Sequence, residues 1–580
     1  MSAGLTPEAL EQLLGDPADP ANPYGWAAAV ARDETDAFPQ QLCETLRDVG
    51  FHLNYLPKQW GGTFESFDRS LTLVRTAARR DVTIMPGTMF SIIAATCLQL
   101  HGTTEQQERV ARILRGGGAV AFALTEADHG SDLLAGEVRL DANGLLHGEK
   151  WLVGNGLRCE AIYVVARTGE RGPGAFTSVL LDLTDGTIDL DDLTRLPAPL
   201  TGGMRGIDLA TLRFNALPVP WDAQVGKEGE GLEVAIRAQQ AVRLMSMAGS
   251  LGIADTALRV TGDFAAERRV GRTTLSATPY AARELAVASA ALLAADAVAL
   301  AAARGVHVVP EAFSVWGLAA KHLVAEAAED LLRRCGTVLA TRSVLREAAP
   351  GDGVFQKLQR DSAVVRVIDA SPYANLRAYC GQLPTLLNGT EVPEPETLRR
   401  IFTLDAELPP YEPARLDLIA RGVDPVLGGL PTVAASVRAA LYDDTPVYDD
   451  TPGVVACLVE AVADLLPRAE AARRPGADPN ALADLAVRYA WLHGAAACVH
   501  LWWANRERPL YGAEPGATGW LRAALGYLLA RAEGTGPQWD GPRLLPALDT
   551  LTALREQDLL FTAAPVPLAT THQEAADAQG

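Results

Sequence analysis

One stretch of the chain places a single carboxylate at the end of an apolar helical pattern. The segment RDSAVVRVIDAS, residues 360–371, carries Asp369 at an otherwise apolar turn. Burying a carboxylate costs free energy unless the group is paired, hydrogen-bonded or put to use. In a dry pocket, with hydrogen bonds that stabilise the charge forming on a substrate, such a group can abstract a proton. Asp369 is therefore a candidate general base, and the alternative is an Asp that caps the helix or pairs with a cation.

Two earlier stretches carry groups suited to an anion or to the polar edge of a ring. In AFALTEADHGSD, residues 121–132, Thr125 and a Gly-Ser pair lie on a turn that offers hydroxyls and backbone N–H groups. In HGEKWLVGNG, residues 147–156, a strand runs into a turn, and Trp151 and Leu152 can cover a flat ligand. Because these are also ordinary turn residues, neither stretch identifies a ligand by itself.

The composition narrows the class of partner. The chain has 580 residues, 48% of them apolar, and a net charge of -20 from 51 basic and 71 acidic side chains. An acidic surface argues against nucleic acid or an anionic membrane as the main partner. The seven cysteines are scattered and form no C-x-x-C pair, so neither a disulfide framework nor a metal site is predicted.

The first thirty residues have no signal-peptide pattern, and the apolar stretch from Leu285 is typical of a packed bundle helix. We expect a cytoplasmic protein without membrane insertion.

The elements that must position these residues change type twice along the chain. Helical spacing over residues 6–118 gives way to short alternating runs between 120 and 226, and it returns from 231 to about 387. A Pro- and Glu-rich break and a further Ala- and Leu-rich helical stretch follow. The predicted fold is mainly α with a small β domain and an additional helical domain at the carboxy-terminal end. The predicted parts are an N-terminal helical domain (1–119), a middle β domain (120–226), a C-terminal helical bundle domain (227–387), a linker (388–412), an additional helical domain (413–570) and a disordered tail (571–580).

Seven landmarks, in a shared order and spacing over about residues 25–385, resemble the acyl-CoA dehydrogenase family. They are FPQQLCETLRDVGFHLNYLPKQWGG, HGTTEQQERVARILRGG, ALTEADHGSD, LHGEKWLVGNG, GMRGIDLATLRFNALPVP followed by VGKEGEG, GDFAAERRVG, and RDSAVVRVIDAS. The resemblance implies the family's fold: a helical domain, a β-barrel-like domain and a four-helix bundle. It also implies FAD in a cleft between the β domain and the bundle, and removal of two hydrogens from an acyl thioester.

The resemblance assigns cofactor contacts residue by residue. Leu124 and Thr125 match positions that contact the flavin ring, and Phe122, two residues earlier, is included as a candidate cofactor-binding residue. Gly130 and Ser131 match positions beside the pyrophosphate and the pantetheine arm of the thioester. Ser131 is therefore a candidate for positioning the substrate as well as for binding FAD.

Several candidate FAD contacts depart from the family's pattern. Leu152 stands where the family usually has Trp or Phe, and Gly154 where it has Ser or Thr, so a hydroxyl hydrogen bond to flavin N5 is missing and only the Gly154 N–H can donate. Arg268 lies one residue nearer the next glycine than the family's Arg, and a solvated arginine is the alternative. The later glycine cluster is reduced to Gly336, and Ser371 replaces the usual Thr. We still predict FAD as the cofactor.

An ungapped alignment with the family's Tyr-Glu-Gly-Thr signature puts Asp369 on the catalytic Glu. Some members carry the base on another helix immediately before an Arg, and that position here is Val242, before Arg243. Asp369 is thus the acid we nominate as base, and Arg243 is a candidate substrate-positioning residue. Asp is shorter than Glu by roughly 1.5 Å, and a misplacement of about an ångström can cost on the order of a hundredfold in rate.

The same resemblance suggests partners. Members with an added helical domain are commonly dimers, so we expect a homodimer. The composition and the variant signature look like a group from actinobacterial secondary metabolism that acts on fatty-acyl chains held by CoA or by an acyl carrier protein. The leading hypothesis is an FAD-dependent acyl-thioester dehydrogenase that forms an α,β double bond and passes electrons to an electron-transferring flavoprotein. Two alternatives stay open: an acyl oxidase or monooxygenase that uses O2, and a catalytically silent scaffold.

Overall fold

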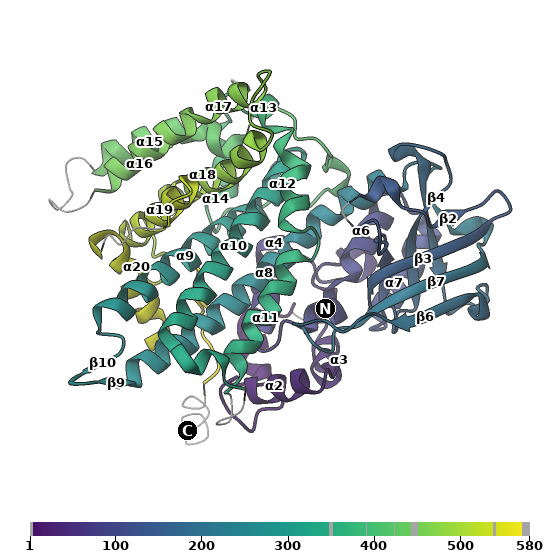
Figure 1. The fold of residues 1–580 in the computed structure, drawn as a ribbon, viewed down its shortest axis with the longest axis horizontal. Helices are drawn as coiled ribbons and strands as arrows, with labels where there is room; N and C mark the ends of the chain where they lie inside the picture. The colour runs from purple at the N-terminus through teal and green to yellow at the C-terminus, as the bar shows by residue number, and fades with distance from the viewer. Residues whose placement is uncertain are drawn as a thin grey trace.

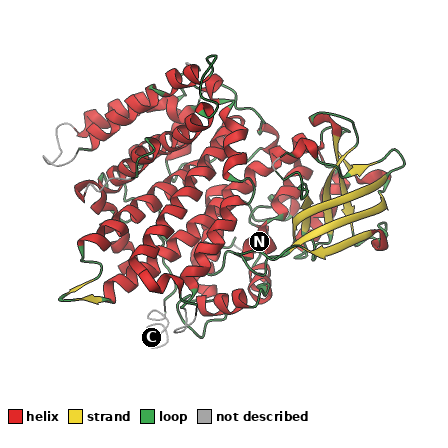
Figure 2. Cartoon of the chain, in the orientation of Figure 1, coloured by secondary structure: helices red, strands yellow, loops and turns green. Residues whose placement is uncertain are grey.

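The computed structural model describes residues 4–130, 132–346, 352–389, 391–422, 424–441, 450–536 and 541–570. It confirms the predicted fold class, because helices make up most of the molecule and a small sheet forms one end of it (Figure 2). The boundaries of the individual domains stay predictions. The tail 571–580 lies outside the described residues.

The chain begins with short helices that cover one side of the long central helices (Figure 1). The sequence fixes several of their ends locally: Pro7 follows the Thr6 cap of the first helix, and Thr103 and Gln106 form a capping box at the seventh. The helices are α1 (Pro7–Leu14), α2 (Trp26–Glu34), α3 (Gln40–Asp48), α4 (Phe67–Ala78), α5 (Ile84–Met89), α6 (Ser91–His101) and α7 (Thr104–Arg115).

The sheet lies between two hydrophobic cores. Along β4, Tyr163 and Val165 face the main core shared with the helices, whereas Ile162 and Val164 face a separate core within the sheet. Burial on both faces explains why this strand is apolar throughout instead of alternating. The strands are β1 (Val120–Ala123), β2 (Arg139–Leu140), β3 (Leu145–Gly154), β4 (Ala161–Arg167), β5 (Phe176–Asp182), β6 (Leu193–Pro197), β7 (Leu209–Pro218) and β8 (Gln224–Val225), in the order β6-β7-β3-β2-β4-β5-β8 with β1 parallel to β4.

Long helices and several shorter ones form the bundle beside the sheet. Helix α9 lies at its centre and packs against α8, α10, α18, α19 and α20. It is the one helix among the described residues that is long and apolar enough to cross a membrane, and its apolar window is 100% buried inside the protein. Its many alanines let neighbouring helices approach closely. The bundle elements are α8 (Gly231–Glu267), the small strands β9 (Arg269–Val270) and β10 (Thr273–Thr274), α9 (Pro279–Val308), α10 (Phe313–Leu339), α11 (Val354–Val367), α12 (Pro372–Cys380) and α13 (Leu383–Leu386).

The carboxy-terminal extension forms a further helical layer against α9, α10 and α12 (Figure 1). Its buried face is continuous with the main core. It therefore stabilises the bundle directly. The helices are α14 (Pro395–Phe402), α15 (Pro425–Leu441), α16 (Thr451–Ala463), α17 (Leu465–Ala472), α18 (Ala481–Ala504), α19 (Gly519–Ala532) and α20 (Gly541–Glu556).

The segment predicted as a linker, 388–412, is fastened to the bundle. Helix α14 lies within it, and the buried guanidinium of Arg304 on α9 donates hydrogen bonds of 2.8–3.2 Å to five carbonyls between Arg400 and Ala406. Three residues further along α9, the two ring nitrogens of His307 contact the N–H of Phe67 and the carbonyl of Pro409, both at 3.0 Å. The composition of the segment suggested a connection, but its backbone is held by side chains of another domain.

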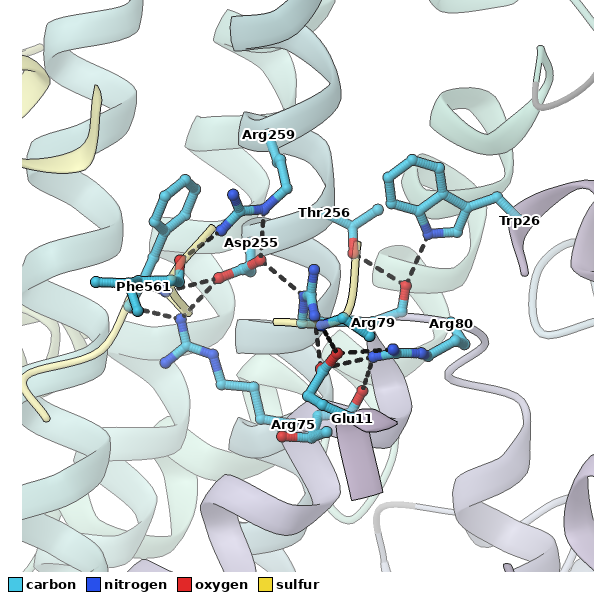
Figure 3. A network of polar contacts seen from close by, with 12 residues as sticks. Glu11, Trp26, Arg75, Arg79, Arg80, Asp255, Thr256, Arg259 and Phe561 are labelled. Atoms are coloured by element: carbon cyan, nitrogen blue, oxygen red, sulfur yellow. Dashed lines mark hydrogen bonds and ion pairs between the residues drawn. The ribbon is translucent and has the colours of Figure 1, made fainter. Parts of the chain in front are cut away.

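The last described residues pass through a buried network of charges (Figure 3). Asp255 on α8 accepts hydrogen bonds from Arg79 Nε at 3.0 Å and from the Phe561 N–H at 3.0 Å, and Arg75 donates to the Phe561 carbonyl at 2.6 Å. Glu11 on α1 pairs with Arg79 and with Arg80. The network joins α1, α4, α8 and the carboxy-terminal segment at one buried point.

Candidate active site

Asp369 lies in a short loop between two helices. Helix α11 ends at Val367, two residues earlier, and α12 begins at Pro372, where Ser371 is the N-cap and its hydroxyl accepts the Ala374 N–H at 3.2 Å. The backbone of Asp369 is left-handed, with φ of +62°, a conformation that Asp tolerates better than most residues. Asp369 therefore caps neither helix, which removes one of the two structural explanations offered from the sequence.

Two cations and a hydroxyl from the bundle surround this loop. The Ser246 hydroxyl on α8 donates a hydrogen bond to the Asp369 carboxylate. Lys321 on α10 donates to the carbonyls of Ile368 and Ala370, the latter at 2.7 Å. Arg243, one helical turn before Ser246, is 5% exposed, and its Nε has no hydrogen-bond partner among the described residues.

Burial controls the protonation of both cations. It lowers the pKa of Arg243 to about 10 and that of Lys321 to about 8, and in each case the nearby Asp369 carboxylate works in the opposite direction. The two cations also oppose each other, because the charge of Arg243 further lowers the pKa of Lys321. The loop thus has two nearby cations and one carboxylate. A further anionic group that binds here would be stabilised by the positive charge that Asp369 does not neutralise.

The residues predicted to contact the flavin ring follow strand β1. The carbonyl of Leu124 accepts a hydrogen bond from Lys150 Nζ at 2.8 Å, and the carbonyl of Thr125 accepts the Trp151 N–H at 2.8 Å. Lys150 also pairs with Glu126 at 2.8 Å, and the same carboxylate accepts N–H groups from residues 137 and 138. This buried pair holds the loop after β1 against strand β3, so the two motifs separated in the sequence do meet.

At the end of β3, the backbone of Gly154 lies against the ring of Phe90. Leu152 has a left-handed φ of +52°, and a β-carbon placed on Gly154 would lie 2.4 Å from the Phe90 ring. Phe90, between α5 and α6, thus packs where the resemblance puts the contact with flavin N5. Phe90 was not among the residues predicted to contact FAD.

The remaining predicted residues are spread over three places. Phe122 stacks on Tyr163 at 5.8 Å within β1 and β4. Gly130 is exposed with open space beside it, and Ser131 lies outside the described residues. Gly336 on α10 faces Gln359 and lines a groove of about 380 Å³.

Arg268 lies apart from all of them. It is an exposed residue that follows the last residue of α8, and roughly 37 Å of helix separate it from Arg243. Within this chain the structure brings Asp369 and Arg243 together, and separately Leu124, Thr125, Leu152 and Gly154. It does not bring Arg268 to either group.

Helix α8 runs between the two groups of predicted residues that lie together, the group at Asp369 and the group at Leu124. Leu232, in its first turn, lines a small cavity with Leu124 and Lys150, and Arg243 follows roughly 16 Å further along the same helix. A ligand lying along α8 could thus reach both. No cluster of His, Cys, Asp and Glu suited to a metal ion is found among the described residues.

Comparison with known proteins agrees with this arrangement of a sheet, a helical bundle and a loop bearing Asp369. Models of the N-terminal, middle and C-terminal domains of acyl-CoA dehydrogenase match residues 25–117, 121–217 and 229–369. Together they cover more than half of the chain, which belongs to the acyl-CoA dehydrogenase family.

Individual relatives are distant. The probable acyl-CoA dehydrogenase FadE10 of Mycobacterium tuberculosis is 28% identical over 240 residues, which span 40% of this chain and 36% of that protein. Among solved structures, acyl-CoA dehydrogenase complexed with FAD from Bacillus anthracis is similar over 95% of this chain and 94% of its own, with a TM-score of 0.67 and 16% identity. Butyryl-CoA dehydrogenase from Megasphaera elsdenii is similar over 66% of this chain and 99% of its own, with a TM-score of 0.58 and 21% identity. At such identities the two structures support the fold, including the extension in the first case.

Proposed function

We propose that the protein is an FAD-dependent acyl-thioester dehydrogenase that removes hydrogens from the α and β carbons of a fatty-acyl chain. The observation that carries this proposal is the position of Asp369, a half-buried carboxylate bonded to Ser246 and flanked by Arg243 and Lys321. The family's members are FAD-dependent oxidoreductases, and the position of the family's base falls on this residue.

The residues present fit FAD. The backbone at Gly154 carries no side chain, open space lies beside Gly130, and the buried Arg243 Nε has no partner among the described residues. These features suit a ligand with a flat ring and anionic groups, provided that the Phe90 ring turns away from Gly154. The residues that would hold the flavin ring are Leu124, Thr125, Leu152 and Gly154, which lie together, whereas the contacts of Phe122, Gly130, Ser131, Arg268, Gly336 and Ser371 with FAD stay predictions from the resemblance. Bound there, FAD would supply an acceptor for the hydride from the β carbon.

The chain's own residues would handle the proton. Asp369 would take it from the α carbon, and Ser246 orients the carboxylate that does so. The positive charge of Arg243 would attract the thioester oxygen as negative charge develops on it. Because Asp is shorter than Glu, the α carbon must lie closer to the loop than it would for a Glu base.

Substrate and partners are part of the proposal. CoA and an acyl carrier protein are both possible carriers, and electron-transferring flavoprotein is the proposed acceptor. We also propose a cytoplasmic homodimer. Light scattering on the purified protein tests the dimer, and a stable monomer would contradict it.

Gly154 favours one alternative function. Without a hydroxyl at this position the family's hydrogen bond to flavin N5 is absent, so O2 could be the acceptor, as in an acyl oxidase or monooxygenase. Peroxide formed with a thioester substrate and no added acceptor would distinguish this reaction from that of a dehydrogenase.

Anaerobic flavin bleaching tests the proposal. The purified protein is mixed with a panel of acyl-CoA and acyl-carrier thioesters, and the visible spectrum is followed for the wild type and for Asp369→Asn. We expect a thioester to bleach the wild type and to leave the variant coloured. Bleaching that is equally fast in the variant would exclude Asp369 as the base. A colourless protein that stays colourless with added FAD would favour a scaffold.

A further inference from the structure

A lysine on α10 holds the loop that carries Asp369 from both sides. Lys321 is 2% exposed, and its ammonium donates to the carbonyls of Ile368 and Ala370. These are the residues immediately before and after Asp369. In the sequence Lys321 lies within the mostly apolar run WGLAAKHLVAEAA, and nothing in that run indicates that its ammonium contacts backbone carbonyls.

The two hydrogen bonds restrict the backbone of Asp369. A charged donor makes shorter and stronger hydrogen bonds to carbonyls than a neutral one, and α10 is a 27-residue helix buried along most of its length. The anchor is therefore rigid compared with the short loop it holds. With φ fixed at +62°, Asp369 can direct its carboxylate only within a narrow range.

Ser246 holds the side chain of Asp369, whereas Lys321 holds the backbone on either side of it. Its hydroxyl contacts the carboxylate and comes from α8, whereas Lys321 contacts the backbone and comes from α10. Asp369 is thus held between two helices of the bundle. A short base needs such an arrangement more than a long one, because an error of about an ångström can cost on the order of a hundredfold in rate.

We propose that Lys321 is a positioning residue for Asp369: by holding the carbonyls on both sides, it sets the place from which the carboxylate reaches the substrate's α carbon. This inference rests on the proposed function, because it assumes that Asp369 is the base. The charged groups that face the ammonium are Asp369 on the loop and Arg243 on α8. The next residue, His322, faces Glu326, Arg366, Arg531 and Lys321 itself.

Exchange of the substrate's α hydrogen with D2O tests the inference without hydride transfer. Phenylacetyl-CoA has an acidic α hydrogen and no β hydrogen, so it reports proton abstraction alone. We expect Lys321→Met to slow this exchange about tenfold to a hundredfold, with the Kd for the thioester changed by less than about twofold. Lys321→Arg, which keeps a cationic donor, should recover most of the rate.

Deuterium uptake by the protein gives a second measurement that needs no substrate. In Lys321→Met the peptide covering residues 366–374 should exchange its amide hydrogens faster than in the wild type, because the loop has lost its anchor. Lys357→Met is the matched control: Lys357 is also buried but pairs with Asp81 and Asp361. It should lower stability without slowing α-hydrogen exchange per folded molecule.

Asp369→Asn separates failure of this inference from failure of the proposed function. If Asp369→Asn abolishes α-hydrogen exchange and Lys321→Met does not slow it, the positioning role is wrong and Asp369 remains the base. If Asp369→Asn exchanges as fast as the wild type, both are wrong. Should Lys321→Met be recovered only unfolded, Lys321→Gln takes its place with the same expected slowing, and a wild-type rate in that variant overturns the inference.

Discussion

Two buried clusters of charge lie on the same helix, α8, and they differ in how completely their charges are paired. Around Asp255, the arginines at 75, 79 and 259 all lie within 3.7 Å of the carboxylate, and backbone groups of the carboxy-terminal segment bind both carboxylate and guanidinium. Around Asp369, two buried cations face one carboxylate, and the Nε of Arg243 has no hydrogen-bond partner among the described residues.

The difference separates stability from function. A buried ion pair whose charges all have partners holds elements together, and removing one member leaves the others uncompensated. A buried cation without a partner costs free energy in the folded protein, and such groups gather where a ligand supplies the missing charge. We therefore expect the cluster at Asp255 to govern folding and the cluster at Asp369 to govern chemistry.

The largest expected effect comes from breaking the paired cluster. Asp255→Ala leaves three buried arginines without their shared carboxylate, so the free energy of unfolding should fall by about 3–5 kcal/mol. Urea denaturation of the purified variant measures this. The control is Asp263→Ala on the same helix, α8; it removes a half-exposed carboxylate paired with Arg555 of α20 and should cost about 0–1 kcal/mol. Equal losses in the two variants would contradict the distinction between the clusters.

The next effect depends on pH. Burial lowers the pKa of Lys321 from 10.5 to about 8, so between these values the unfolded chain holds a proton that the folded protein has released. Stability must then rise with pH in this window. Relative to Lys321→Met, the wild type should gain on the order of 3 kcal/mol from about pH 8 to pH 10.5. Urea denaturation of both proteins across the window measures the difference, and parallel curves would mean that Lys321 keeps an ordinary pKa.

A smaller effect should appear only in activity. Arg243→Met removes a buried cation whose Nε has no hydrogen-bond partner among the described residues, so we expect no loss of stability. We expect kcat/KM to fall about a hundredfold, the lower end of the loss that follows removal of one group stabilising the charge of a transition state. Steady-state kinetics and urea denaturation of the same preparation test both parts. A variant with full activity and lowered stability would assign Arg243 to the structural group.

The smallest expected effect concerns the bare backbone at Gly154. A β-carbon there would lie 2.4 Å from Phe90, so Gly154→Ala should cost about 1–2 kcal/mol through overpacking. In a Phe90→Ala background the same substitution should cost almost nothing, because the clashing ring is gone. Thermal denaturation of the four proteins in this cycle measures the coupling. Additive losses would mean that Phe90 does not pack on Gly154.

The sequence predicted the fold well because periodicity and the order of motifs are local properties. It also led to Asp369, since one acid at an apolar turn is visible in the letters alone. It could not predict what Lys321 or Arg304 contacts. Their partners are backbone carbonyls, which every residue has, so no pattern of side chains distinguishes the five carbonyls around Arg304 from any others.

Phe90 was missed for a related reason. Its significance lies in what it covers, a glycine more than sixty residues away in the sequence, and nothing in the segment around Phe90 points to that glycine. The segment 388–412 shows the same limit. Its prolines and acids indicate a connection, whereas its attachment to Arg304 and His307 depends on side chains of α9.

The buried network at Asp255 also sets the order in which the chain can mature. The N–H groups of Phe561 and Ala569 bind Asp255 and Glu11, so residues near both ends of the chain complete one cluster. During synthesis the arginines of α4 and the carboxylates of α1 and α8 leave the ribosome long before these partners do. The cluster that joins α1, α4 and α8 can therefore close only after residues 561–569 have been made, even though the helices that it joins are made first.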